Sequence, residues 1–167
     1  MKRRVFVTGG AHGIGRSVVE AFSAMDDHVA FCDIDLEQGK MTVDATGAKF
    51  YPVDVTEQTQ LEDCLKTITG LWGDIDVMVN NVGISTFTEI SVEEFDRIIS
   101  TNLRPAFITS RFLARHRQEN RNTAYGRIVN ICSTRYLMSE AGTEGYSASK
   151  GGIFSLTHAL AISLAPL

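Results

Sequence analysis

Tyr146 and Lys150, four positions apart, are the residues of this sequence best suited to acid–base chemistry. On a helix, side chains at this spacing project from the same face. An ammonium beside a phenol favours the phenolate, so the phenol can exchange protons with an alcohol or a ketone closer to neutral pH. Ser133 lies thirteen residues before Tyr146, and a serine from a neighbouring strand end can hydrogen-bond the same substrate oxygen. An exposed tyrosine and lysine at helical spacing are also common surface features. The rest of the sequence must therefore decide whether this pair is catalytic or merely a surface feature.

Length, composition and charge are those of an ordinary globular domain. The chain has 167 residues, 44% of them hydrophobic and 22% charged, enough for one domain with a buried core. A net charge of −4 and the lack of a long apolar stretch indicate neither nucleic acid nor a membrane as partner. Cys32, Cys64 and Cys132 lack metal-ligand spacing, which predicts buried free thiols and no metal site. The apolar run near the N-terminus is too short for a secretory signal, so we expect a cytoplasmic protein.

Short β-rich segments alternate with longer segments of helical periodicity. The expected strands are 5–8, 28–32, 49–53, 75–79 and 127–131. The expected helices are 14–25, 36–44, one capped by Thr56, a long one from Ser91 through Leu113, and 148–165. This alternation predicts a doubly wound α/β domain, with a parallel sheet and right-handed crossover helices on both faces. In such sheets, ligands bind at the carboxyl ends of the strands.

A glycine-rich loop follows the first expected strand, with Gly9, Gly13 and Gly15 before a helix. Glycines let the backbone turn tightly and approach a pyrophosphate, while the helix N-terminus offers free N–H groups to the anion. The position between a strand and a helix therefore favours a phosphate site. His12 and Arg16 of the same loop either assist phosphate binding or are incidental.

Polar residues also follow the other strands. Asp33 follows the second strand, where a carboxylate accepts hydrogen bonds from an adenosine ribose and repels a 2′-phosphate, which favours NAD over NADP. Asp54 and Val55 follow the third strand, where a carboxylate and a backbone amide can reach an adenine edge. Asn81 and Gly83 follow the fourth and let the chain pass close to a flat ligand. Each of these groups is also a common turn or capping residue.

In this order and spacing, the motifs resemble the short-chain dehydrogenase/reductase family, with its Rossmann core and catalytic tyrosine. The resemblance covers essentially the whole chain and implies a Rossmann-like sheet with strand order 3-2-1-4-5. It implies a catalytic tetrad of Asn102, Ser133, Tyr146 and Lys150. The cofactor-binding residues that it implies are Gly9, His12, Gly13, Ile14, Gly15, Asp33, Asp54, Val55, Asn81, Gly83, Tyr146 and Lys150.

The resemblance also implies a role for each member of the tetrad. The cofactor, NAD rather than NADP, carries the hydride. Tyr146 is the expected general acid/base at the substrate oxygen, and Lys150 assists it and hydrogen-bonds the nicotinamide ribose. Ser133 is expected to orient and stabilise the substrate carbonyl or alkoxide, and Asn102 to hold a water in the proton relay. The implied reaction interconverts a secondary alcohol and a ketone.

Two residues near the implied site are expected to alter the local structure. Val82 replaces the alanine of the Asn-Asn-Ala-Gly motif, which we expect to add bulk near the nicotinamide with only local adjustment. Pro105 follows Asn102 within the long helix, where it removes a bond to the carbonyl of Thr101 and is expected to kink the helix.

Members of the family are longer than this chain. We therefore expect residues 1–167 to form a single dinucleotide-binding and catalytic domain that lacks the family's last two strands and C-terminal substrate segment, leaving the fifth strand as an edge. The alternative is a dinucleotide-binding module or inactive fragment without turnover, although the complete tetrad favours an enzyme. The family's subunit pairing implies a homodimer or homotetramer. Phe107, Phe112, Phe154 and Leu156 are available either for that interface or for the monomer core.

Overall fold

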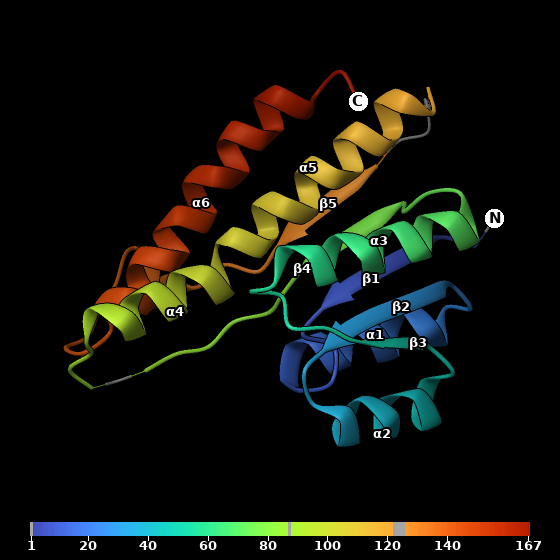
Figure 1. Ribbon diagram of the computed structural model, residues 1–167. Coiled ribbons are helices and arrows are strands. Elements are labelled where there is room, and N and C mark those ends of the chain that lie inside the picture. The colour runs from blue at the N-terminus through green and yellow to red at the C-terminus, as the bar shows by residue number, and fades with distance from the viewer. Residues whose placement is uncertain (1, 87, 122–125) are drawn as a thin grey trace.

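One parallel sheet runs through the molecule with strand order β3-β2-β1-β4-β5, as predicted (Figure 1). The computed structural model describes residues 2–86, 88–121 and 126–167. The strands are β1 Arg4–Thr8, β2 His28–Asp33, β3 Lys49–Pro52, β4 Val77–Asn80 and β5 Arg127–Asn130. The helices are α1 Gly13–Ala24, α2 Leu36–Thr46, α3 Gln58–Trp72, α4 Val92–Asn102, α5 Arg104–Glu119 and α6 Glu144–Leu164, with a 3-10 turn η1 Thr134–Tyr136. None of the described helices combines the length and apolarity that crossing a membrane requires.

Two apolar clusters hold the helices against opposite faces of the sheet. Side chains alternate between the faces along a strand, so β1 contributes to both clusters. Phe6 of β1 packs with Leu65 of α3 on one face, and Val7 packs with Val19 of α1 on the other. Cys32 and Cys64 are buried free thiols in the first cluster, and burial raises the pKa of Cys64 to about 12. The central strands are thus covered on both faces, as parallel sheets require.

The long helix expected from Ser91 through Leu113 is in fact two helices, α4 and α5, which meet at Leu103. Ser91 does begin the first, because its Oγ accepts the N–H of Glu94 at 3.2 Å. Pro105 lies in the first turn of α5, where its missing N–H leaves no helical bond unmade. The proline therefore starts a new helix instead of kinking a continuous one, and Asn102 becomes the last residue of α4.

Other boundaries differ from the sequence prediction too: β4, expected at 75–79, is Val77–Asn80, and two differences affect the site. Thr56 does not cap α3, which begins two residues later with Glu57 at the capping position. The N–H and hydroxyl of Thr56 instead both donate to Asp54 Oδ1, at 2.9 and 2.7 Å. These bonds hold residues 54–56 in a turn, and α3 begins after it, at Gln58. The last helix, α6, begins at Glu144, four residues before the expected start at residue 148. This earlier start places Tyr146 in its first turn.

Candidate active site

A cavity of about 940 Å³ opens at the carboxyl ends of the strands. The order of the strands reverses between β1 and β4, and a crevice forms at such a switch point in doubly wound sheets. The predicted site residues that line it are Gly9, His12, Gly13, Ile14, Asp33, Asp54, Val55, Asn81, Gly83, Tyr146 and Lys150. Gly15, Asn102 and Ser133 belong to the described chain but lie outside this lining. The structure thus gathers residues from the ends of β1, β2, β3 and β4, from the start of α1 and from α6 around one space.

The glycine loop after β1 lies close to the start of α1. Gly9 has a left-handed φ of 68°, which a side chain would disfavour. A Cβ on Gly15 would lie 1.9 Å from the carbonyl oxygen of Gly9, so only glycine lets α1 begin this near the loop. Within the described chain, no side chain caps α1 and its first turn has no acidic residue, whereas Asp35 caps α2. The first N–H groups of α1, at Gly13 and beyond, therefore fit an anion such as a dinucleotide pyrophosphate.

Thr8 and Asn81 join the ends of β1 and β4. Thr8 Oγ1 accepts the N–H groups of Asn81 at 3.0 Å and of Val82 at 3.2 Å. Asn81 Nδ2 donates to the carbonyls of Thr8 and Gly9, at 3.1 and 3.0 Å. The asparagine side chain thus binds the backbone at the end of β1, while Val82 packs on the core as well as lining the cavity. Sequence reasoning placed Thr8 at the start of the cofactor loop but gave it no role of its own.

Tyr146 and Lys150 lie on one face of α6, as their spacing predicts. Lys150 Nζ is 5.7 Å from the centroid of the Tyr146 ring and donates to the carbonyl of Ile131, after β5, at 2.7 Å. Lys150 is only 4% exposed, and this burial lowers the pKa of its ammonium. A Cβ on Gly83 would lie 3.6 Å from Lys150 Nζ, so the lysine also reaches the loop after β4. The cation is fixed between two strand ends and beside the phenol.

Asn102 is buried behind the cavity wall. Its Oδ1 accepts the N–H of Ile84 at 2.8 Å, and its Nδ2 donates to the carbonyl of Ile84 at 2.8 Å. The same Nδ2 donates to Ser149 Oγ at 3.0 Å, and Ser149 donates to the carbonyl of Tyr146 at 2.7 Å. Asn102 and Ser149 together connect the loop after β4 to the helix that carries Tyr146. Sequence reasoning missed Ser149, whose position three residues after Tyr146 is its one local signal.

Ser133 and Cys132 follow β5. Ser133 Oγ accepts the N–H of Arg135 at 3.2 Å at the start of η1, which leaves its own O–H available to donate. Cys132 is partly buried and lines the cavity, and its thiol donates to the carbonyl of Lys150 at 3.3 Å. Of the two, the cysteine rather than the predicted serine forms part of the cavity wall.

The two predicted aspartates have local partners as well as places on the cavity wall. Asp33 Oδ2 accepts the N–H of Ala11 at 3.0 Å, and its Oδ1 accepts the N–H of Asp35 at 3.1 Å. Asp54 Oδ1 accepts two bonds from Thr56, which makes Asp54 a turn residue. Both aspartates therefore stabilise turns, which is the alternative that the sequence allowed. Both can still accept further hydrogen bonds from a ligand in the cavity.

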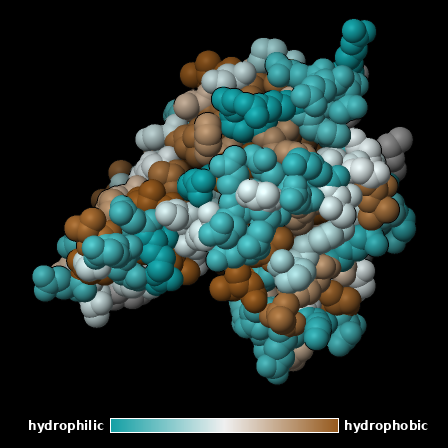
Figure 2. All heavy atoms as spheres, viewed as in Figure 1, coloured by the Kyte–Doolittle hydropathy of each residue, from teal (hydrophilic) through white to brown (hydrophobic). Residues whose placement is uncertain are grey.

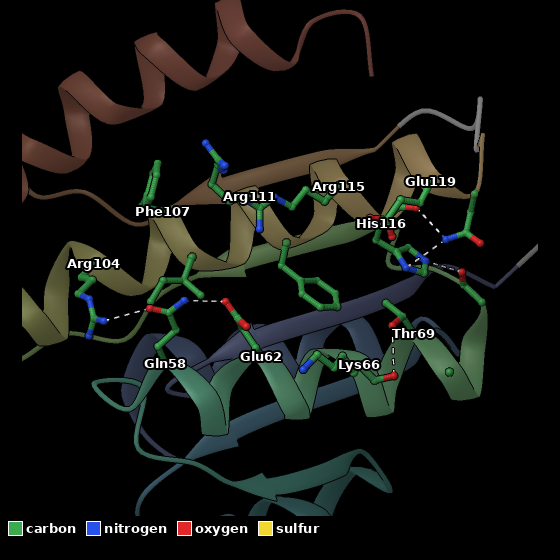
Figure 3. A pocket seen from close by; sticks show the side chains of 15 residues that line it. Gln58, Glu62, Lys66, Thr69, Arg104, Phe107, Arg111, Arg115, His116 and Glu119 are labelled. Carbon is green, nitrogen blue, oxygen red and sulfur yellow. Dashed lines mark hydrogen bonds between the residues drawn. The ribbon is translucent and has the colours of Figure 1, made fainter.

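A second cavity, of about 840 Å³, lies between α3 and α5 (Figure 3). Three of its polar side chains form a chain of hydrogen bonds. Arg104 donates to Gln58 Oε1 at 3.2 Å, and Gln58 donates to Glu62 Oε1 at 2.8 Å. Among the described residues, no member of the predicted site lines this space, which is formed by two helices away from the strand ends. We therefore place the candidate site in the cavity at the strand ends.

Comparison with known proteins gives consistent matches along the whole chain. The sequence profile of the family described as short chain dehydrogenase matches residues 3–167. An uncharacterized oxidoreductase of Thermotoga maritima is 36% identical over 169 residues, which cover 95% of this chain and 64% of the relative. A 3-oxoacyl-acyl-carrier-protein reductase of Chlamydia pneumoniae is 31% identical over 171 residues, covering 98% of this chain and 68% of the relative.

A solved structure of similar fold is that of an apo SCOR enzyme from Clostridium thermocellum. Its TM-score with this chain is 0.89 at 36% sequence identity, and the match covers 99% of this chain and 68% of that one. The chain spans less than two thirds of the length of the Thermotoga maritima relative.

Proposed function

The chain belongs to the short-chain dehydrogenase family, and from this premise we propose an NAD(H)-dependent oxidoreductase that interconverts a secondary alcohol and a ketone. One observation carries the proposal: Tyr146 and Lys150 line the same cavity as the glycine loop at the start of α1. A cavity that combines an acid–base pair with a pyrophosphate site is suited to hydride transfer between a nicotinamide and the carbon of an alcohol or a ketone. The name of the Chlamydia pneumoniae relative describes reduction of an oxoacyl group, which agrees with a ketone as substrate.

A nicotinamide dinucleotide would supply the hydride, and the residues of the cavity fit its parts. The uncapped start of α1, at Gly13 and Ile14, would bind the pyrophosphate. Asp33 would accept from the adenosine ribose, and Asp54 with Val55 would face the adenine. NAD is favoured over NADP because a carboxylate at the end of β2 repels a 2′-phosphate.

Proton transfer would be the task of α6 and its neighbours. Tyr146 would exchange the proton with the substrate oxygen, beside the buried ammonium of Lys150. Ser133, whose O–H is available to donate, would stabilise the developing alkoxide. The side-chain amide of Asn102 is already engaged with Ile84 and Ser149, so a relay water at this residue would bind its main chain.

Exchange of Tyr146 for phenylalanine tests this assignment. Tyr146→Phe should abolish turnover, because the acid–base hydroxyl is lost, while the affinity for NADH stays nearly unchanged. Turnover is followed by the absorbance of reduced nicotinamide with a panel of polyols, hydroxy acids, acyl thioesters and hydroxysteroids, and affinity by NADH fluorescence. Tyr51→Phe on the edge strand β3 makes the same change away from the cavity and should retain activity.

The outcomes separate two classes of function. Retained turnover in Tyr146→Phe would refute the role of Tyr146. NADH binding by the wild type without turnover of any substrate in the panel would instead support the second candidate function, a dinucleotide-binding module. The presence of Tyr146, Lys150, Asn102 and Ser133 together in the sequence favours the enzyme, because a pure binding module needs none of the four.

We propose a cytoplasmic homodimer or homotetramer acting on a small-molecule alcohol or ketone. Figure 2 shows hydrophobic side chains at the surface along α6. Phe154 and Ile162 of α6 are 41% and 80% exposed, and Phe107 of α5 is 46% exposed. Phe112 and Leu156 are partly buried, and Phe112 packs on the core. Of the four residues considered from sequence, Phe107 and Phe154 are therefore those suited to a subunit interface.

A further inference from the structure

Asn130, the last residue of β5, belongs to a chain of side-chain hydrogen bonds that crosses the carboxyl ends of β4 and β5. Thr109 Oγ1 of α5 donates to Asn80 Oδ1 at 2.7 Å, and Asn80 Nδ2 donates to Asn130 Oδ1 at 2.8 Å. Asn130 Nδ2 in turn donates to Thr157 Oγ1 of α6 at 2.9 Å. The chain of bonds therefore connects α5, the ends of two strands and α6.

Thr157 is the member of this chain that lies on α6. Its hydroxyl donates to the carbonyl of Ile153, one turn earlier, at 2.7 Å, so its oxygen acts as the acceptor for Asn130. Thr157 is exposed, and neither Thr157 nor Asn130 lines the cavity at the strand ends. Their bond thus joins a helix to a strand outside the surface that a ligand would contact.

Two further bonds join the segment after β5 to α6, and both involve Lys150. Lys150 Nζ donates to the carbonyl of Ile131 at 2.7 Å, and the thiol of Cys132 donates to the carbonyl of Lys150 at 3.3 Å. Lys150 and Thr157 are seven residues apart, so they lie on one face of α6 with about 10 Å between them along the axis. Three successive residues, 130 to 132, therefore each bind α6.

The position of the Ile131 carbonyl depends on Asn130, which directly precedes it. The N–H of Ile131 donates to the carbonyl of Asn80 at 2.9 Å, so both the main chain and the side chain at this point are bonded to β4. Lys150 is only 4% exposed, and water cannot readily replace an acceptor that moves away from a buried ammonium. The bond between Asn130 and Thr157 therefore bears on how Lys150 is held.

We propose that Thr157 and Asn130 are positioning residues, whose hydrogen bond fixes α6 on the end of β5 and thereby holds Lys150 against the carbonyl of Ile131. The inference rests on the proposed function, in which Lys150 assists proton transfer at Tyr146. Moving a catalytic group by about 1 Å can cost about a hundredfold in rate, even when the altered residue lies far from the chemistry. Loss of one bond that fixes α6 is therefore expected to be measurable in turnover.

Thr157→Val tests the hydroxyl, because it keeps the branched shape and removes the acceptor. Thr157→Ser keeps the hydroxyl and should restore the wild-type behaviour. Thr67→Val on α3 is the matched control, because Thr67 is also exposed and its hydroxyl also donates to the carbonyl four residues earlier, at 2.8 Å. Within the described chain, the Thr67 hydroxyl makes no side-chain bond to a strand.

Two measurements follow Lys150, one of them without cofactor or substrate. The rate at which an acetylating reagent modifies Lys150 is measured by mass spectrometry, with the exposed Lys40 of the same sample as the internal reference. The second measurement is kcat with a substrate of the panel that the wild type converts. Both are made in conditions under which urea unfolding shows every variant to be fully folded.

Thr157→Val should raise the acetylation rate of Lys150 by roughly threefold to tenfold and lower kcat by a similar factor, the range expected for one hydrogen bond. Thr157→Ser and Thr67→Val should stay within about twofold of the wild type. In an Asn130→Ala background, Thr157→Val should have no further effect on acetylation, because the bond is already absent.

A lower free energy of unfolding with unchanged acetylation of Lys150 and unchanged kcat would show that the bond is only structural, and would overturn the proposal. Faster acetylation without a change in kcat would overturn the role in the reaction, and an equal effect in Thr67→Val would overturn the assignment to Thr157. A wild type that converts no substrate of the panel would refute the proposed function instead. The acetylation rates would then still decide whether Thr157 positions Lys150, so the two failures are distinguishable.

Discussion

Replacing Ser149 with alanine removes one oxygen from the fully buried contact between α4 and α6. Ser149 Oγ accepts from Asn102 Nδ2 at 3.0 Å and donates to the carbonyl of Tyr146 at 2.7 Å. The variant leaves one N–H of the Asn102 amide without its partner in a place that water does not reach, since Asn102 is 3% exposed and Ser149 is 0% exposed. An unsatisfied buried donor costs about 1–3 kcal/mol, so we expect the free energy of unfolding to fall by that amount.

Urea unfolding followed by circular dichroism measures this loss. Ser155→Ala is the matched control, because it makes the same chemical change on the same helix at an exposed position. It should alter the free energy of unfolding by less than about 0.5 kcal/mol. Equal, small effects in both variants would refute the reasoning, because Asn102 would then find another partner at no cost.

A double-mutant cycle separates the Asn102–Ser149 contact from the rest of the core. Asn102→Ala and Ser149→Ala should be coupled by at least 0.5 kcal/mol, the order expected of residues in one hydrogen-bond network. If instead the two changes add, the residues are independent, and Ser149 does not connect α4 to the helix that carries Tyr146.

Three further predictions concern the loop, acid stability and assembly. Gly15→Ala places a Cβ against a backbone oxygen and should abolish NADH binding, measured by fluorescence. Gly70→Ala on α3, where a Cβ meets nothing within 4 Å, should leave binding intact. Equal binding by both variants would contradict the close approach of the loop to α1. Arg4, through its hydrogen bonds, lowers the pKa of Asp76 below its usual range, so this pair stabilises the protein above about pH 4, and its contribution is lost as the pH falls through the lowered pKa. Asp76→Asn should therefore cost about 1 kcal/mol at pH 7 in urea unfolding and less at pH 3, and a pH-independent cost would refute this linkage. Phe154→Glu should shift the mass measured by light scattering toward the monomer, and an unchanged mass would exclude this residue from the interface.

The class of fold could be read from the sequence because its signals are local. Alternating β-rich and helical segments predicted a doubly wound sheet, and the strand order inferred from the family resemblance is confirmed. The helix boundaries that apolar periodicity placed wrongly are set by local hydrogen bonds and by proline. Asp54 binds Thr56 in a turn before α3, and Pro105 is more stable in a first turn than inside a helix.

The candidate site likewise has features that the sequence predicts and features that only the tertiary structure sets. Gly9 and Gly15, and the pair Tyr146 and Lys150, are recognisable because neighbours in sequence on a turn or a helix face are neighbours in space. The partners of buried polar groups are set by the packing of separate elements, so tertiary structure alone decided that Asn102 meets Ser149, 47 residues away. Tertiary structure likewise decided that Asp35 caps α2 while holding His12, 23 residues before it. A composition or a spacing cannot encode such pairs, because each depends on how two elements dock on the same sheet.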